Sequence, residues 1–385
     1  MLGYLLARAG VEVVVLEKHG DFFRDFRGDT VHPSTLQVMH ELGVLEDFLK
    51  LPHQELTSVS GRVGDFSFHA ADFSHLPTRC KFVALMPQWD FLNFLSGRAK
   101  RFARFQLRMQ CEGVDLIRQG QRIAGVEARS HEGPLHIQTD LVVACDGRHS
   151  TMRRAAGLEV QEFGVPIDVL WFRISRREGD PEQLLGNVNY SRALILINRG
   201  DYFQGGLIIP KGSFEKTEQD GLYAFREMIR RIAPYLGSRV SELEGWDGIK
   251  LLTVQINRLR TWHLPGLLCI GDAAHAMSPA GGVGINLAIQ DAVATANLLA
   301  EPLRQRRVTE DDLARVQRRR EFPTRATQWV QVQAHKQFER VFQTSGPLEA
   351  PWQLKAIARL PGLQRVMGRV VGMGARPEHV ARHRA

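Results

Sequence analysis

The hydrophobic residues at the start of the chain follow first a helical and then an extended pattern. Apolar residues recur at helical spacing over 2–9, and Gly10 stands where a helix commonly ends. Residues 11–16 are mostly β-branched, and Glu17 closes the run. The pattern predicts a helix, a tight turn and a buried strand that ends in a carboxylate.

The pattern of the next hundred residues predicts a mixture of helices and strands. Helices are expected over 34–42, capped by Ser34 or Thr35, and over 89–101, where apolar residues again follow helical spacing. Runs of alternating or β-branched residues predict strands at 107–111, 122–129, 135–139 and 140–145.

The pattern changes between residues 163 and 256. Runs such as 165–174, 193–198 and 202–210 alternate or are rich in β-branched residues, and one helix is expected near 222–236. Alternation of this kind is typical of an antiparallel sheet with one buried face. The chain therefore predicts a sheet domain inserted into an α/β domain.

The first helix and strand match the second half of a βαβ dinucleotide-binding unit, in which the terminal carboxylate, here Glu17, binds a ribose. The first half, a strand followed by G-x-G-x-x-G, is absent from the sequence. We therefore expect the natural polypeptide to extend upstream of Met1 by roughly 15 to 25 residues, the size of a strand and its glycine turn. The alternative is that Met1 is the true start and the protein is a damaged copy.

Two acidic turns follow predicted buried strands. Asp146-Gly147 follows one of them, and taken alone such a pair is most often an ordinary turn. Gly271-Asp272 follows another, and a glycine-rich loop at 278–286 and a helix over 287–300 come next. A carboxylate, a glycine-rich loop with free N–H groups and the positive end of a helix thus meet at one point. This arrangement suits a ligand with hydroxyl groups and an electron-rich head.

Composition narrows the possible functions of the 385 residues. A hydrophobic fraction of 44% and a charged fraction of 24% are ordinary for a globular chain of two or three domains. The net charge of +8 comes from short basic runs with acidic residues between them, so no nucleic-acid partner is expected. No apolar run reaches about 18 residues, so no transmembrane helix is expected. Four widely separated cysteines argue against a metal site and for a reducing, cytoplasmic location.

Together the motifs resemble those of the single-component flavoprotein monooxygenases, the aromatic hydroxylases of the para-hydroxybenzoate hydroxylase type. Residues 271–275 and the loop after them resemble the motif that contacts the flavin ribityl chain, and residues 145–150 resemble the second signature of the family. The resemblance covers nearly the whole chain, and the missing G-x-G-x-x-G is its clear departure. The cofactor-binding residues that it implies are Glu17, Arg27, Gln88, Asp146, Gly147, Gly271, Asp272, Pro279, Gly281, Gly282, Gly284, Ile285 and Asn286.

The chemistry that this resemblance implies belongs to FAD. NADH or NADPH reduces the flavin, O2 then gives a C4a-hydroperoxide, and its distal oxygen passes to an aromatic or polyketide-like small molecule. Asp272 is expected to hold the ribityl chain, and the helix start near Gly284 is expected to stabilise the negative edge of the reduced flavin. No catalytic acid or base is identified, and a structural role is favoured for His275. A monomer or homodimer is expected.

The predicted fold class is α/β, with a Rossmann-like FAD-binding domain, an inserted, mostly antiparallel β-sheet substrate domain and a C-terminal helical region. The FAD-binding domain is predicted over 1–55, 84–160 and 257–345, the substrate domain over 56–83 and 161–256, and the helical segment over 346–385. Candidates for the substrate pocket, by alternation alone, are Trp171, Arg173, Asn187, Tyr190, Gln204 and Ile208.

Alternatives stay open for the last segment and for the function of the whole chain. The apolar stripe 363–371 predicts a helix that packs on the FAD-binding domain, with a membrane-surface helix as the alternative. The chain is expected to be a monooxygenase, and a related reductase or halogenase on the same fold is the first alternative. The sequence lacks the Trp-x-Trp-x-Ile-Pro signature of flavin halogenases. The second alternative is an inactive remnant.

Overall fold

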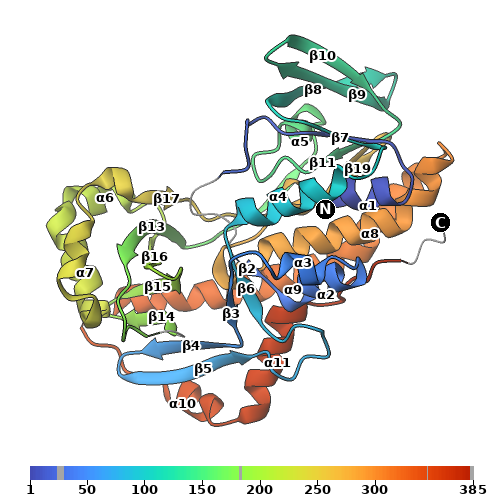
Figure 1. The fold of residues 1–385 in the computed structure, drawn as a ribbon. Helices are drawn as coiled ribbons and strands as arrows, with labels where there is room; N and C mark the ends of the chain where they lie inside the picture. Colours follow the sequence, from blue (N-terminus) through green and yellow to red (C-terminus); the bar gives the residue numbers. More distant parts are fainter. Residues whose placement is uncertain (24–29, 182–183, 345, 382–385) are drawn as a thin grey trace.

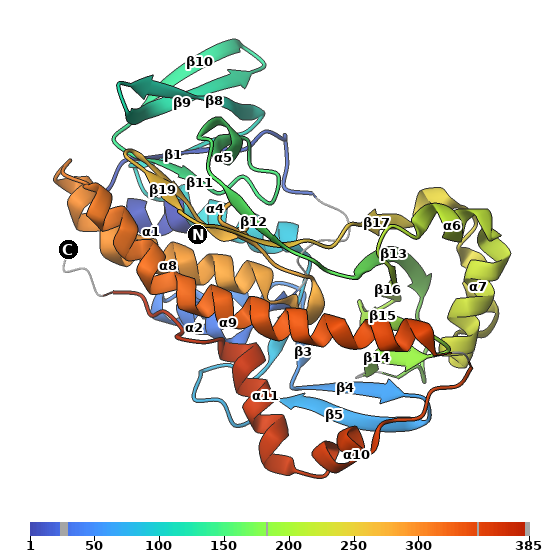
Figure 2. The ribbon, with the colours of Figure 1, turned by 180° about the vertical axis from the view of Figure 1, so that it is seen from behind.

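The computed structural model describes residues 1–23, 30–181, 184–344 and 346–381, so Arg27 of the predicted site lies outside the described residues. Figures 1 and 2 show a group of helices and short parallel strands next to a broad twisted sheet. One long helix, α9, runs behind both of them. Helices and strands alternate along the chain, as the α/β prediction requires.

The parallel strands of the first part form two separate small sheets. In one, β1 pairs in parallel with β7, and in the other β11 pairs in parallel with β20, which continues to β19. The bounds of these strands are β1 (Val13–Leu16), β7 (Phe105–Arg108), β11 (Val142–Ala144), β19 (His263–Leu264) and β20 (Leu267–Cys269). The prediction that the first strand is buried is wrong, because β1 has one neighbour among the described strands and Val14 is 39% exposed.

Helices pack around these strands. Helix α1 (Leu2–Arg8) contacts both α4 (Gln88–Ala99) and α8 (Gly284–Arg304), and α8 also packs along α9 (Glu310–Gln343). The segment Ala280–Arg304 is long and apolar enough to cross a membrane by length and composition, but 67% of its apolar window is buried inside the protein. This helix is therefore the core helix of the domain.

The surrounding elements complete this part. Helix α2 begins at Pro33 with His32 as its N-cap, so the predicted cap by Ser34 or Thr35 is wrong, and the Thr35 hydroxyl instead donates to Asn286. The elements here are β2 (Thr30–Val31), α2 (Pro33–Glu41), α3 (Leu45–Phe48), β3 (Gln54–Leu56), β6 (Val83–Leu85), β8 (Cys111–Gln119), β9 (Arg122–Ser130), β10 (Gly133–Gln138), α5 (Thr151–Ala155), β12 (Val160–Phe163), β18 (Ile256–Leu259) and β21 (His275–Ala276).

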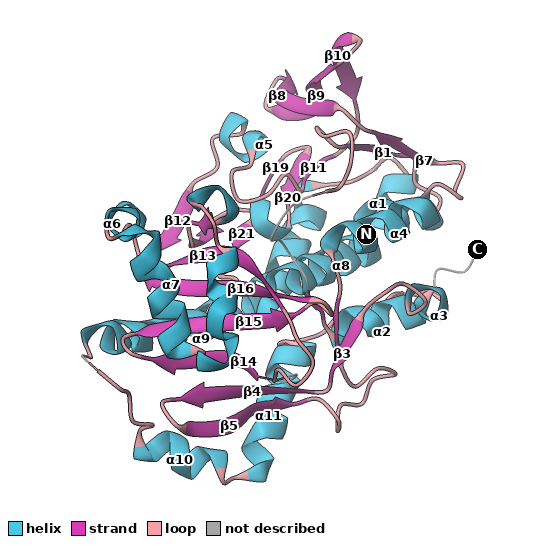
Figure 3. Cartoon of the chain, turned by 60° about the vertical axis from the view of Figure 1, so that its left-hand side comes forward, coloured by secondary structure: helices cyan, strands magenta, loops and turns pink. Residues whose placement is uncertain are grey.

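The broad sheet has seven strands in the order β17-β13-β16-β15-β14-β4-β5, and all its pairs are antiparallel except β14 with β4 (Figure 3). One face packs on α7 through Leu170, Phe172 and Leu194. The other face carries Val169 and Trp171 toward the first part. The elements are β4 (Ser58–Val63), β5 (Phe66–Asp72), β13 (Ile167–Ser175), β14 (Leu184–Asn189), β15 (Arg192–Asn198), β16 (Tyr202–Pro210), α6 (Phe214–Gln219), α7 (Gly221–Ile232) and β17 (Lys250–Leu252).

The C-terminal helices α10 (Trp352–Ala358) and α11 (Pro361–Met373) lie below the broad sheet in Figure 1. Helix α11 packs mainly on β5 and also contacts α2, where His32 Nδ1 lies 2.8 Å from the Val371 carbonyl, while Val366 and Val370 of the predicted stripe are exposed. Gly368 and Gly372 face inward instead, because a side chain there would collide with the backbone of Asp72 or with neighbouring side chains. The two glycines allow the close approach of this helix to the sheet, and Val371 of the stripe packs beside them.

Candidate functional site

A cavity of about 2280 Å³ lies between the parallel strands, α8 and the inner face of the broad sheet. Its wall is more apolar than polar, and α1, α4, α9 and α11 also contribute to it. Of the predicted cofactor-binding residues, the structure brings eleven to this wall. They are Glu17, Gln88, Asp146, Gly147, Gly271, Asp272, Pro279, Gly281, Gly282, Gly284 and Ile285.

The loop that precedes α8 needs glycine at two consecutive positions. Gly281 and Gly282 have φ angles of 79° and 62°, in the left-handed region that favours glycine. A Cβ atom at Gly282 would also collide with the hydroxyl of Thr30, which donates to the Gly282 carbonyl at 3.0 Å. The chain turns here directly into α8 at Gly284. Because the first turn of a helix leaves N–H groups without helical partners, this end can receive an electron-rich group.

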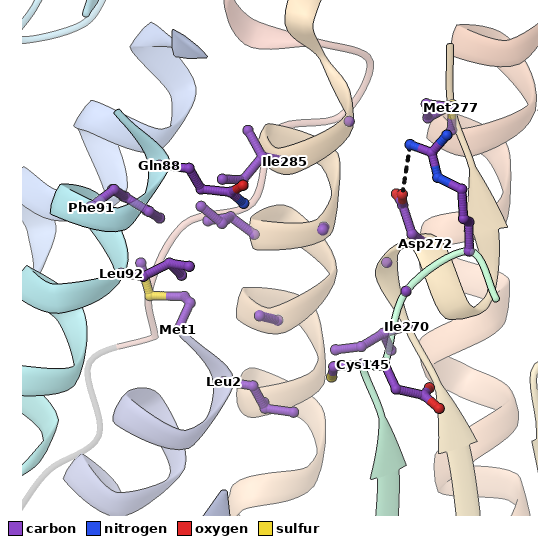
Figure 4. Close-up of a pocket in the computed structure, with 18 of the residues that line it drawn as sticks. Met1, Leu2, Gln88, Phe91, Leu92, Cys145, Ile270, Asp272, Met277 and Ile285 are labelled. Carbon is purple, nitrogen blue, oxygen red and sulfur yellow. Dashed lines mark ion pairs between the residues drawn. The ribbon is translucent and has the colours of Figure 1, made fainter. Parts of the chain in front are cut away.

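Gly271-Asp272 lies at the end of β20, beside α8. Gly271 has a φ of 59°, and its N–H donates to the Asp291 carboxylate of α8 at 3.1 Å. Asp272 is partly exposed and lies 3.8 Å from the guanidinium of Arg148, an ion pair drawn as a dashed line in Figure 4. Buried Arg153 joins this turn to the other acidic turn by donating to the carbonyls of Ala273 and Arg148, at 3.1 and 2.7 Å.

The two acidic turns differ in what their carboxylates do. Asp146 accepts from the Ser150 hydroxyl at 2.5 Å and from the Met152 N–H at 3.1 Å, so both its oxygens help to begin α5. Gly147 has a φ of 85° and open space where a side chain would be. The structure therefore gives Asp146 the role that the ordinary-turn interpretation describes, although the residue also lies on the cavity wall.

Asn286 does not lie on the described cavity wall. Its Oδ1 accepts from the His32 N–H at 2.9 Å and from the Thr35 hydroxyl at 2.8 Å, and its Nδ2 donates to the carbonyls of Thr30 and Gly282, both at 3.1 Å. These four bonds use the hydrogen-bonding capacity of the amide. The side chain of Asn286 therefore braces the loop, and a contact between this residue and the cofactor stays a prediction.

His275 and Asp291 form a buried pair beneath the Gly271 turn. The Nε2 atom of His275 lies 2.6 Å from Asp291, and Arg320 of α9 donates to the same carboxylate at 2.9 Å. Burial alone would raise the pKa of Asp291, but the charges and hydrogen bonds of His275 and Arg320 hold it below its ordinary value. His275 is 1% exposed and supports the turn from behind, as the structural interpretation expects.

The other end of the cavity is bounded by β1 and β11. Val13 and Val15 of β1 and Val143 of β11 face into it, with Glu17 after the end of β1. Figure 4 shows Met1 and Leu2 beside α8, between α4 and the strand ends that carry Cys145 and Ile270. Cys145 is exposed, whereas Cys80, Cys111 and Cys269 are buried.

The broad sheet supplies the wall opposite the loop. Trp171 of β13 and Gln204 and Ile208 of β16 line this wall, because alternate residues of these strands face the cavity, as the sequence pattern predicted. Asn187 also belongs to the described wall, but it pairs in register with Leu194 of the core under α7, so its side chain faces away from the loop. Arg173 and Tyr190 do not belong to the described wall. The sequence missed the wall residues Phe338 of α9 and Met367 and Val371 of α11, because nothing local links distant helices to a cavity.

The chain matches the model of the FAD binding domain family over residues 1–330. It is 29% identical over 394 residues to 6-methylpretetramide 4-monooxygenase of Streptomyces rimosus, which covers 96% of this chain and 88% of the relative. It is 27% identical to rifampicin monooxygenase of Streptomyces venezuelae over 312 residues, and there it spans 76% of its own length and 60% of the relative.

Solved structures share the fold. The anhydrotetracycline hydroxylase OxyS from Streptomyces rimosus has a TM-score of 0.73 at 19% identity, covering 96% of this chain and 72% of that one. A probable FAD-dependent monooxygenase from Pseudomonas aeruginosa, pqsL, has a TM-score of 0.73 at 21% identity, covering 89% and 96%. These matches confirm the predicted fold class, and the family match confirms FAD as the cofactor, with NAD(P)H as the reductant typical of the family. The chain thus belongs to the FAD binding domain family and is an FAD-dependent monooxygenase.

Proposed function

We propose that this monooxygenase hydroxylates a planar, largely apolar aromatic substrate of the polyketide type. The observation that carries the proposal is the continuity of the cavity, which runs from the glycine loop before α8 to the inner face of the broad sheet. Trp171, Ile195 and Ile208 on that face offer flat and branched apolar surfaces. The name of the relative at 29% identity, 6-methylpretetramide 4-monooxygenase, supports an aromatic substrate of several rings.

The proposed residue roles follow from position. FAD, when bound and reduced by NAD(P)H, supplies oxygen activated from O2. The amides at the start of α8, around Gly284, would face the electron-rich edge of the flavin, and Asp272 would accept bonds from the ribityl hydroxyls. Glu17, after β1, would hold the adenosine ribose, with Gln88 at the start of α4 also contacting the cofactor.

The chain's own part in the reaction is placement and exclusion of water. The apolar sheet face and Phe338 of α9 would keep water from the reacting atoms, a task on which such chemistry depends. We assign no acid or base, because His275 is buried behind the Gly271 turn and held by Asp291. We also infer a cytoplasmic location, supported by four free cysteines, and a monomer or homodimer.

The test is an oxygenation assay with the purified chain and FAD. A polycyclic phenol should accelerate NADH or NADPH consumption, and ¹⁸O from labelled O2 should enter the product. Reduction of the substrate without incorporation of ¹⁸O would contradict the proposal and favour a reductase. A chain that folds but takes up no FAD would favour the inactive-remnant alternative.

A further inference from the structure

Helix α9 presents a stripe of buried polar side chains to the segment before α8. Gln328, Gln331 and His335 lie three and four residues apart, so they share one helix face. All three are at most 5% exposed. Buried amides are costly unless they are bonded, so the partners of this stripe show what the helix holds.

Gln331 is bonded to the loop on both sides of Pro279. Its Oε1 accepts from the Ser278 N–H at 3.1 Å, and its Nε2 donates to the carbonyls of Ser278 and Ala280, at 3.0 and 2.9 Å. One side chain therefore satisfies three backbone groups in a segment that forms no regular ladder. These groups lie immediately before Gly281 and Gly282 on the cavity wall.

His335 extends the same contact by one turn. Its Nε2 atom lies 3.0 Å from the Ser278 hydroxyl, which also accepts from the Ala280 N–H at 3.2 Å. Burial lowers the pKa of His335 to about 4, so at neutral pH the ring is uncharged and Nε2 can accept from the hydroxyl. Phe338, three residues further on, reaches the cavity wall itself.

The loop is thus held from two sides. Asn286 and Thr30 fix the Gly282 carbonyl, and Gln331 with His335 fixes the segment from Ser278 to Ala280. With both ends tied, the left-handed residues between them have little freedom to move. Preorganised donors of this kind bind and stabilise charge better than mobile ones.

We propose that Gln331 is a positioning residue that sets the place of loop 278–282 against the flavin, and so tunes the affinity and the electronic state of the bound cofactor. The inference rests on the proposed position of the flavin beside this loop. In this proposal α9 holds the glycine loop in place, which the loop and α8 do not do by themselves. No contact between Gln331 and the cofactor is needed, because its effect passes through the carbonyls of Ser278 and Ala280.

The chain offers a matched control one turn earlier. Gln328 is as deeply buried as Gln331 and also makes three bonds, but to the carbonyls of Asn257 and Ala276 and to the Arg258 guanidinium. Gln328→Met and Gln331→Met each remove one buried amide of α9 at nearly constant volume. Both variants should lower the melting temperature to a similar extent.

The affinity for FAD and the spectrum of the bound flavin should distinguish the two variants. In the full chain, Gln331→Met should weaken FAD binding by about tenfold and shift the visible absorbance bands of the bound flavin, whereas Gln328→Met should leave both nearly unchanged. The reduction potential of the flavin should fall in Gln331→Met alone, because ordered amides favour the reduced, negative form. Equal flavin affinity and spectra in all three proteins, or equal losses in both variants, would overturn the proposal.

Amide hydrogen exchange without FAD separates this inference from the proposed function. Loop 278–286 should exchange faster in Gln331→Met than in the unchanged protein and in Gln328→Met. Unchanged exchange there would overturn the positioning role, whatever the chain binds. If the loop exchanged faster in Gln331→Met but the unchanged protein took up no FAD, Gln331 would still hold the loop, but its link to the flavin and the proposed function would both be refuted.

Discussion

The two ends of the cavity are built on different principles. At the end formed by β20, loop 278–282 and α8, backbone groups are bonded to buried side chains such as Asn286, Gln331 and Asp291. At the end formed by β1 and β11, the wall includes valine side chains on strands that each pair on one side within the described residues, with Glu17 after the end of β1. At the first end, a polar cradle, buried side chains hold the backbone, whereas the second end has strand edges without a described partner. Ligand affinity should therefore depend mainly on the first end in the chain as it stands.

We expect the greatest loss of FAD affinity when the polar cradle itself is disturbed. Gly282→Ala places a side chain against the Thr30 hydroxyl and a Cβ atom at a φ of 62°. We expect FAD binding to weaken by about a hundredfold, measured by quenching of flavin fluorescence. Gly97→Ala is the control, because Gly97 lies in α4 with open space around it and should at most gain about 1 kcal/mol in stability. Equal FAD affinity of the two variants would show that the loop is not the flavin site.

The acidic turns provide the next test. Asp272→Ala should keep the fold and weaken FAD binding by roughly ten- to a hundredfold, since a charged hydrogen bond contributes about 1.5 to 3 kcal/mol. Asp146→Ala should instead lower the free energy of unfolding by about 1 kcal/mol, because it removes the bonds to Ser150 and Met152 at the start of α5. Isothermal titration and urea unfolding of both variants check this. If Asp146→Ala lost more FAD affinity than Asp272→Ala, the two roles would have to be exchanged.

The role of the end formed by β1 and β11 can be tested by adding the predicted upstream strand to the chain. The predicted upstream strand with its G-x-G-x-x-G turn remains a prediction, and the cleft between β1 and β11 is where a further parallel strand would pair. A form of the chain extended by such a segment should bind FAD at least about tenfold more tightly, because backbone donors would reach the pyrophosphate. It should also be more soluble, since the open edges would be paired. Equal FAD affinity of the given chain and the extended chain would contradict the interpretation of the first seventeen residues as part of a βαβ unit.

The smallest expected effect is a pH dependence near the cradle. Burial lowers the pKa of His32 to about 4, although its bonds to the carbonyls of Val371 and Gly281 act in the opposite direction. The unfolded chain binds this proton below about pH 6.5, and the folded chain binds it only near pH 4. Stability is therefore full above pH 6.5 and falls between pH 6.5 and 4, by at most about 1.4 kcal/mol per pH unit from this group. Urea unfolding from pH 7 to 5 should show a shallower slope for His32→Gln, and identical slopes would contradict this.

The sequence predicted the local parts of this structure well. The strand, acid and glycine loop around Gly271-Asp272 were visible because their signal lies in consecutive residues, and eleven predicted cofactor residues line one cavity. The helix after the loop was visible for the same reason. The exposure of β1 was not predicted, since burial depends on neighbouring strands and not on the valines themselves.

The features that could not be predicted from the sequence depend on contacts between distant segments of the chain. Asn286 looked like a ligand in the motif, and only its four bonds to Thr30, His32, Thr35 and Gly282 show that it is a brace. The role of Gln331 could not be predicted, because a glutamine in a long helix carries no sign of the loop more than fifty residues away that it holds. The two inward glycines of α11 were likewise masked by the apolar stripe beside them.

The most direct test is amide hydrogen exchange of the whole chain with and without saturating FAD. If the polar cradle holds the flavin, protection on binding will be greatest over residues 271–286, at the end of β20 and in the loop before α8. Protection will be smaller in β1 and β11, at the other end of the cavity. Protection confined to β1 and β11, with residues 278–286 unchanged, would contradict the claim that the cradle holds the flavin.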